Sequence, residues 1–175
     1  SLILSHTGYT GGDGFEVYGL PEVIKQLFCK FIDLGVVACG LGARDTLRFE
    51  AGLPLYGHEL GPNITPIEAC LDRFIDLDKP FNGRDVLYRQ SKESDRRRLI
   101  GLKLLDRGVP RQDYPVYFGG EQVGQVTSGG FAPHVKEYLA MALVKMSLEG
   151  DKPFEIEIRG KKHRAEKVPT TFLKI

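Results

Sequence analysis

The sequence contains no tryptophan, two methionines and three cysteines among its 175 residues. The cysteines, Cys29, Cys39 and Cys70, are odd in number and form no CxxC pair. This pattern argues against a disulfide framework and against a zinc site, and it favours a reducing compartment. Cys29 falls within an apolar-periodic segment that predicts a helix, so we interpret it as a core residue rather than as a catalytic thiol.

Long apolar runs and an excess of one charge are missing as well. No hydrophobic stretch approaches the roughly 20 residues that span a bilayer, and the sequence predicts no signal or transit peptide. The net charge of +1 gives no reason to expect nucleic acid or an anionic membrane as a partner. The charged run 92–98, KESDRRR, contains no aromatic residue. We therefore interpret it as a solvated linker rather than as an RNA-binding patch.

The pattern of the chain changes near residue 94, which predicts an α+β region over 1–94 and a small antiparallel barrel or sandwich over 95–175. The first region is predicted to hold strands 2–5, 15–18 and 73–77, helices 21–35, 43–51 and 83–90, and a helical turn at 66–69. The second is predicted to hold strands 99–105, 114–118, 122–127, 138–146 and 154–159. Gly119-Gly120 predicts a hairpin, and Gly129-Gly130 predicts a longer turn.

Two arginines lie one turn apart on the predicted helix 43–51, so they can share a face. Arg44 stands in the first turn, where a cation opposes the helix dipole and requires a compensating partner. That partner is either a structural carboxylate or a bound ligand. Arg48 is interpreted as one half of a structural ion pair.

Other polar residues near these segments have both a structural and a functional interpretation. Glu16 begins a predicted strand, where it is either an exposed strand residue or a carboxylate that accepts two hydrogen bonds from a ligand. His58 follows Gly57 in a turn-rich loop and is interpreted as structural. The remaining histidines are scattered without HxxH spacing, so we expect no metal site.

Several motifs, taken together, resemble the aminomethyltransferase family, that of the T-protein of the glycine cleavage system. They run in order through the whole chain and are more specific as a set than singly: TGYTGGDGFE at 7–16, LGARDTLR at 41–48, PLYGHE at 54–59, NITPIEA at 63–69, GVPR at 108–111, GQVTSG at 124–129 and VPTTF at 168–172.

The resemblance implies a fold, a reaction and partners. The fold would be the end of a mixed α/β folate-binding domain followed by a small antiparallel β-barrel. The reaction would pass the methylene carbon from the aminomethyl-lipoyl H-protein to tetrahydrofolate, with release of ammonia and without a metal. The partners would be tetrahydrofolate and the lipoylated H-protein, with no nucleic acid and no membrane. The location would be the cytoplasm of a bacterium or the mitochondrial matrix of a eukaryote.

The resemblance also implies roles for particular residues. Glu16 matches the folate-contacting glutamate, and Arg44 matches the substrate-binding arginine. Phe172 stands where the family often has a tyrosine, so it loses the hydroxyl and keeps a stacking surface. Arg111 matches an arginine of the barrel domain that would face the cleft between domains. The family's catalytic aspartate is expected outside this chain, which would then be a C-terminal fragment that is inactive alone.

Two alternatives remain open from the sequence. One is a folate-binding paralogue, such as the folate-binding domain of a dimethylglycine or sarcosine oxidase or a folate-dependent RNA-modification factor. The other is a non-catalytic binding or scaffold module that keeps the fold for contacts with proteins.

Overall fold

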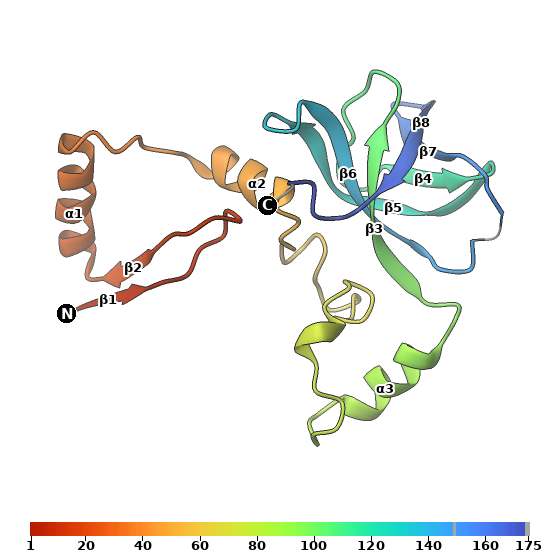
Figure 1. Cartoon of the computed structure of the whole chain (residues 1–175), viewed down its shortest axis with the longest axis horizontal. Helices are drawn as coiled ribbons and strands as arrows, with labels where there is room; N and C mark the ends of the chain where they lie inside the picture. Colours follow the sequence, from red (N-terminus) through yellow and green to blue (C-terminus); the bar gives the residue numbers. More distant parts are fainter. Residues whose placement is uncertain (149, 174–175) are drawn as a thin grey trace. The chain divides into compact units, whose positions relative to one another are not determined.

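The computed structural model describes residues 1–148 and 150–173 of the chain (Figure 1). Internal contacts divide the chain into two compact units, Ser1–Leu53 and Pro54–Ile175. No helix within the described residues is long and apolar enough to cross a membrane. The division of the sequence into domains 1–94 and 95–175 stays a prediction.

The first unit is a β-hairpin followed by two helices. Strand β1 (Leu2–Ser5) pairs antiparallel with β2 (Glu16–Gly19), so that Ser5 lies opposite Glu16. Helix α1 (Pro21–Asp33) begins with proline at its first turn, where the missing N–H costs no hydrogen bond. Helix α2 (Leu41–Glu50) follows. The predicted hairpin and both predicted helices are confirmed.

Helix α1 does not bury its apolar face within the structure. None of its residues is buried, and Phe28 is 56% exposed. Cys29 is exposed as well, so the interpretation of this cysteine as a core residue is wrong for the structure of this chain. Periodicity correctly identified the helix, but burial requires a partner surface, and the described residues cover this face only in part: Val23, Ile24 and Leu27 are half-buried.

The second unit is built around a closed antiparallel barrel, as predicted. Its strands are β3 (Arg97–Leu104), β4 (Pro115–Phe118), β5 (Glu121–Ala132), β6 (Glu137–Lys145), β7 (Phe154–Ile158) and β8 (Lys161–Val168). They close in the order β3-β6-β5-β4-β7-β8. Every strand therefore has two neighbours, and no sheet edge is left unpaired.

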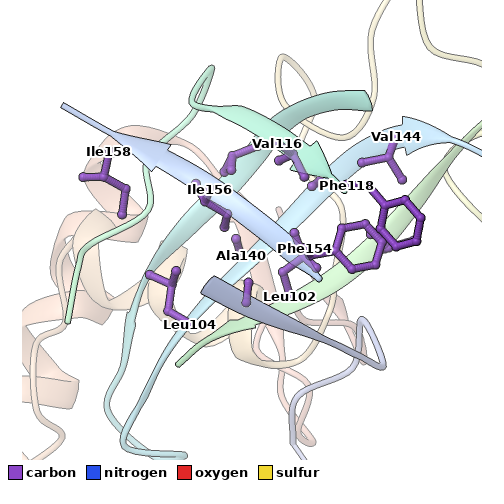
Figure 2. Packing of buried hydrophobic residues seen from close by; sticks show 13 residues of the cluster. Leu102, Leu104, Val116, Phe118, Ala140, Val144, Phe154, Ile156 and Ile158 are labelled. Carbon is purple, nitrogen blue, oxygen red and sulfur yellow. The ribbon is translucent and has the colours of Figure 1, made fainter. Parts of the chain in front are cut away.

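The barrel interior is filled by alternate residues of these strands, because successive side chains of a strand point to opposite faces (Figure 2). Leu102, Val116 and Ile156 are completely buried. Thirteen residues form the cluster, and Phe118 and Phe154 are tilted against each other with ring centroids 4.8 Å apart. The interior is a packed core of aliphatic and aromatic side chains.

Three sequence predictions about the barrel were wrong or incomplete. Gly129-Gly130 is not a turn but part of β5, opposite Ala140 and Leu139. A Cβ on Gly129 would lie 3.1 Å from Pro110, so close approach of another segment accounts for the glycine. Arg97 and Arg98 belong to β3 rather than to a linker. Strand β8 was missed, because Ala165 is its single fully buried residue.

The part of the second unit before the barrel contains a short 3₁₀ helix, η1 (Asp72–Phe74), and helix α3 (Arg84–Lys92). The strand predicted over 73–77 is therefore wrong. The backbone there turns instead, and the Asp76 carboxylate accepts a hydrogen bond from the Asp78 amide at 3.2 Å. Such a local side-chain bond offers the backbone an alternative to strand pairing.

Two side chains tie the segment that follows α2 to the barrel. The Glu68 carboxylate accepts a hydrogen bond from Arg97 Nε at 2.7 Å, and the Glu68 carbonyl accepts one from the Leu99 amide. His58 Nδ1 lies 2.9 Å from the Thr127 carbonyl and 3.2 Å from Ser128 Oγ. His58 therefore makes structural contacts, as interpreted from the sequence.

Candidate functional site

A glycine in the loop between β1 and β2 lets that loop approach the end of α2. Gly11 has φ +79°, and a Cβ on it would lie only 2.4 Å from the Cβ of Ala51. A side chain would be strained there and would collide with Ala51. The glycine-rich motif and the helix motif, far apart in sequence, therefore meet within the first unit.

The meeting of the two motifs places a cation on an aromatic ring. The guanidinium carbon of Arg44 lies 4.9 Å from the centroid of the Tyr9 ring. This distance is within the range of a cation–π interaction. The Tyr9 ring thus offsets part of the cost of a cation in the first turn of α2.

Glu16 lies at the start of β2, half-buried, and its orientation is fixed by a neighbour. The Thr7 hydroxyl donates a hydrogen bond to Glu16 Oε2 at 2.5 Å. Tyr18 lies two residues further along the strand, on the same face. The negative charge of Glu16, partial burial and a hydrogen bond to Glu16 raise the pKa of Tyr18, while the positive charge of Arg44 lowers it.

Glu16 and Tyr18 share one face of β2, and Arg44 lies over the Tyr9 ring. We call these four residues the Glu16–Arg44 cluster. It combines one carboxylate, one guanidinium and two phenol rings. A carboxylate accepts paired N–H donors, a guanidinium binds an anionic group, and aromatic rings cover a planar one. The cluster therefore contains the types of side chain that bind a flat heterocycle with donors at one edge.

The second arginine of α2 has a different environment. Arg48 is 1% exposed, and its guanidinium forms an ion pair with Asp45 at 2.7 Å. The predicted structural ion pair is confirmed. The two arginines of the motif thus differ: Arg48 is buried in an ion pair within the protein, whereas the side chain of Arg44 is exposed.

The other predicted site residues lie in the second unit. Arg111 is exposed, and its Nη1 lies 3.9 Å from the position that a Cβ on Gly130 would occupy. Phe172 is half-buried in the segment after β8. Their roles at a ligand stay predictions.

Sequence reasoning missed two members of the environment of Glu16, namely Tyr18 and Thr7. The two-residue spacing of a strand would have placed Tyr18 beside Glu16. The contact with Thr7 depends on the path of the loop, which no spacing reveals. No group of three or more histidine, cysteine or acidic side chains arranged for a metal ion occurs within residues 1–148 and 150–173.

Comparison with known proteins gives consistent relatives for both parts of the chain. Residues 1–79 match the family described as "GCVT N-terminal domain", and residues 97–174 match the "Glycine cleavage T-protein C-terminal barrel domain". The aminomethyltransferase of Moorella thermoacetica is 48% identical, over 97% of this chain and 48% of the relative. That of Exiguobacterium sibiricum is 46% identical, over 98% and 48%.

A solved structure is similar over nearly the whole chain. The crystal structure of glycine cleavage system aminomethyltransferase T from Bartonella henselae superposes with a TM-score of 0.88 at 32% identity. The match covers 99% of this chain and 50% of that one. The chain spans about half the length of the curated relatives that it matches.

Proposed function

Because the chain belongs to the aminomethyltransferase family, that of the glycine cleavage T-protein, we propose that it carries the pterin-recognising part of a tetrahydrofolate site. The whole protein would transfer the methylene carbon from the aminomethyl-lipoyl H-protein to tetrahydrofolate and release ammonia. The proposal rests on two observations in the first unit: Glu16 and Tyr18 share one face of β2, and the Arg44 guanidinium lies over the Tyr9 ring.

Glu16 is the residue to which we assign pterin recognition. A pterin presents an exocyclic amine and a ring N–H side by side, and one carboxylate accepts both hydrogen bonds. The hydrogen bond from Thr7 holds the Glu16 carboxylate in one orientation before the ligand arrives. Such preorganisation lowers the entropy lost on binding. Tyr9 and Tyr18 supply aromatic surface for the flat ring.

Arg44 is assigned a contact with a negatively charged or carbonyl group of the ligand. Its guanidinium is exposed, and no ion pair of Arg44 with a carboxylate occurs in the described part of the chain. A ligand carboxylate would complete the compensation that the Tyr9 ring begins. We propose weaker contributions from Arg111 and from Phe172, the latter by stacking rather than by a hydroxyl.

We also propose which parts of the reaction lie outside these residues. A catalytic aspartate outside these residues would place the folate nitrogen and the methylene carbon for transfer, so the 175 residues alone should not turn over. The partner would be lipoylated H-protein, and the location the bacterial cytoplasm or, in a eukaryote, the mitochondrial matrix. Purified chain mixed with tetrahydrofolate and aminomethylated H-protein tests this, since any ammonia release above background contradicts it.

Calorimetric titration of Glu16 variants with tetrahydrofolate tests the assigned role, since the chain has no tryptophan to report binding. Glu16→Gln should weaken binding by about 2–5 kcal/mol, because the pterin donors lose a charged partner. Glu22→Gln, in the first turn of α1, is the matched control and should bind as the parent does. Equal affinities of the Glu16→Gln variant and the parent would refute the assignment.

A further inference from the structure

A cavity of about 670 Å³ opens at one end of the barrel, within the second unit. Its size is in the range of small-molecule sites, which barrels often hold at their mouths. The apolar part of its lining consists largely of residues that also belong to the barrel core: Ile100, Phe118, Val144, Phe154 and Ala165. The barrel core thus forms the floor of this cavity.

The floor is partly accessible and strongly apolar. Phe118 and Phe154 retain 9% and 8% exposure, whereas Leu102 and Ile156, further along the interior, retain none. Figure 2 shows the two phenylalanine rings side by side at one end of the cluster, close to Val144. An aliphatic chain that entered here would exchange water for contact with two rings and several methyl groups.

The rim of the cavity carries an excess of positive charge. Among the described residues, four cations line it, Arg98, Lys145, Lys152 and Lys167, against the two acids Asp151 and Glu166. Glu166 is itself 3.6 Å from the Lys103 ammonium, which compensates part of its charge. For Lys145, Lys152 and Lys167 no ion pair occurs among the residues that the structure describes.

Neighbouring segments determine where two of the lining residues, Lys152 and Lys145, lie. The aliphatic stem of Lys152 lies against Gly119, where a Cβ would come within 2.3 Å of Lys152 Cδ. Lys145 stands directly opposite Arg97 across the β3–β6 pair. Like charges in that position repel each other, and the carboxylate of Glu68 pairs with Arg97 alone. Lys145 follows the core residue Val144 in β6, so its side chain points away from the barrel interior, on the face that it shares with Arg97.

We propose that this cavity binds a small amphipathic anion, namely a straight-chain aliphatic monocarboxylate. The chain occupies the apolar floor between Phe118, Phe154 and Ala165. The carboxylate remains at the rim, where the ammonium groups of Lys152 and Lys167 bind it. This site shares no residue with the Glu16–Arg44 cluster and does not depend on the folate proposal.

A homologous series of ligands tests the apolar floor. Hexanoate, octanoate and decanoate are titrated into the chain by calorimetry, below the concentrations at which they form micelles. Binding should saturate at one site and tighten about fourfold for each added methylene, the factor expected when a CH₂ group leaves water. Methyl NMR should show shifts at Ala165, Val144 and Ile100, and none at Val126.

Charge variants test the rim. Lys152→Gln combined with Lys167→Gln should weaken decanoate binding about tenfold, or roughly threefold for each partly exposed charge. Lys161→Gln, at the opposite end of β8, is the control and should leave it unchanged. Decyltrimethylammonium, which has the same chain length and the opposite charge, should not bind.

Several results would overturn the proposal. One is the absence of saturable decanoate binding in a sample whose dispersed methyl spectrum shows a folded barrel. Another is decyltrimethylammonium binding as tight as that of decanoate. A third is a loss of affinity in Lys161→Gln equal to that in the double variant.

Discussion

The two units of this chain bury their side chains to very different extents. In the first unit the buried residues are Arg48, Phe49, Glu50 and Ala51. Large apolar side chains elsewhere in that unit stay exposed, such as Leu34 at 79% and Leu41 at 83%. The second unit buries a cluster of thirteen core residues inside a barrel whose strands all have two neighbours.

This difference in burial indicates that the residues that stabilise the fold lie mainly in the barrel, whereas the residues of the candidate ligand site lie in the first unit. The barrel depends on a core that excludes water, so its stability is sensitive to single methyl groups. The first unit depends on a hairpin, two helices and one close glycine contact. Segments with few buried contacts open more readily, and binding residues are frequently found in them. The Glu16–Arg44 cluster lies in this unit.

The largest expected effect is the loss of stability caused by a truncated side chain in the barrel core, compared with a truncated side chain in α1. Ile156→Ala should lower the free energy of unfolding of the barrel by about 2–5 kcal/mol, because it opens a cavity at a fully buried site. Ile32→Ala, at a position in α1 that is 42% exposed, should change it by about 0.5 kcal/mol or less. Amide hydrogen exchange of β6 measures both values, and equal losses would contradict the difference between the units.

A smaller effect concerns the ion pair between the segment after α2 and the barrel. Arg97→Leu should lower the stability of the second unit by about 2 kcal/mol at pH 7, because Glu68, only 7% exposed, loses a charged hydrogen bond. Arg107→Leu, an exposed position, is the control. Urea unfolding of the two variants and the parent provides the comparison.

The pH dependence of the same pair has a defined sign. Burial alone would raise the pKa of Glu68, but the hydrogen bonds from Arg97 and Thr65 and the charge of Arg97 lower it overall. The pair therefore contributes stability above the ordinary glutamate pKa of about 4.3, and this contribution is lost as the pH falls through the lower folded value. The difference between parent and Arg97→Leu should shrink on acidification, and a constant difference would argue against the ion pair as its cause.

A third prediction concerns the contact that assembles the site. Gly11→Ala should destabilise the first unit by about 1–2 kcal/mol, because alanine is strained at positive φ and collides with Ala51. Gly12→Ala is the matched control, since nothing lies within 4 Å of its added Cβ. Thermal unfolding, followed by the NMR signals of the Tyr9 ring, should occur at a lower temperature in Gly11→Ala and at the parent's temperature in Gly12→Ala. A similar response of both would mean that the contact does not hold the loop.

The smallest effect is a titration within the site. Glu16→Gln should lower the pKa of Tyr18, because the carboxylate charge that opposes the phenolate is removed. Arg44→Gln should raise it, since the nearby cation is lost. NMR of ring-labelled tyrosine follows the titration, with Glu22→Gln as control. If neither substitution changed the pKa of Tyr18, the three side chains would not lie close enough to influence one another.

The fold could be predicted from the sequence where the pattern of apolar residues was strong. Helix α1 has clear helical periodicity and β6 is an almost continuous apolar run, so their positions were predictable. Strand β8 was not predictable, because most of its side chains face water. Its pairing with β7 is made by backbone groups, which amino-acid composition does not reveal. The glycines of β5 were misread, since sequence does not reveal the approach of Pro110.

The site was predictable only in its components. Glu16 and Arg44 were chosen from a family resemblance, and their types suited the chemistry. Their convergence depends on Gly11 meeting Ala51, and on the stacking of Arg44 over Tyr9, which are tertiary contacts between distant segments. Spacing in sequence carries no information on such contacts.

Mapping tetrahydrofolate binding onto this chain by amide and tyrosine-ring NMR tests the central claim most directly. We expect saturable shifts to concentrate on Tyr9, Glu16, Tyr18 and Arg44, while the amides of β6 in the barrel stay unchanged. Shifts confined to the barrel, or none in a sample with a dispersed spectrum, would contradict the assignment of pterin recognition to the first unit.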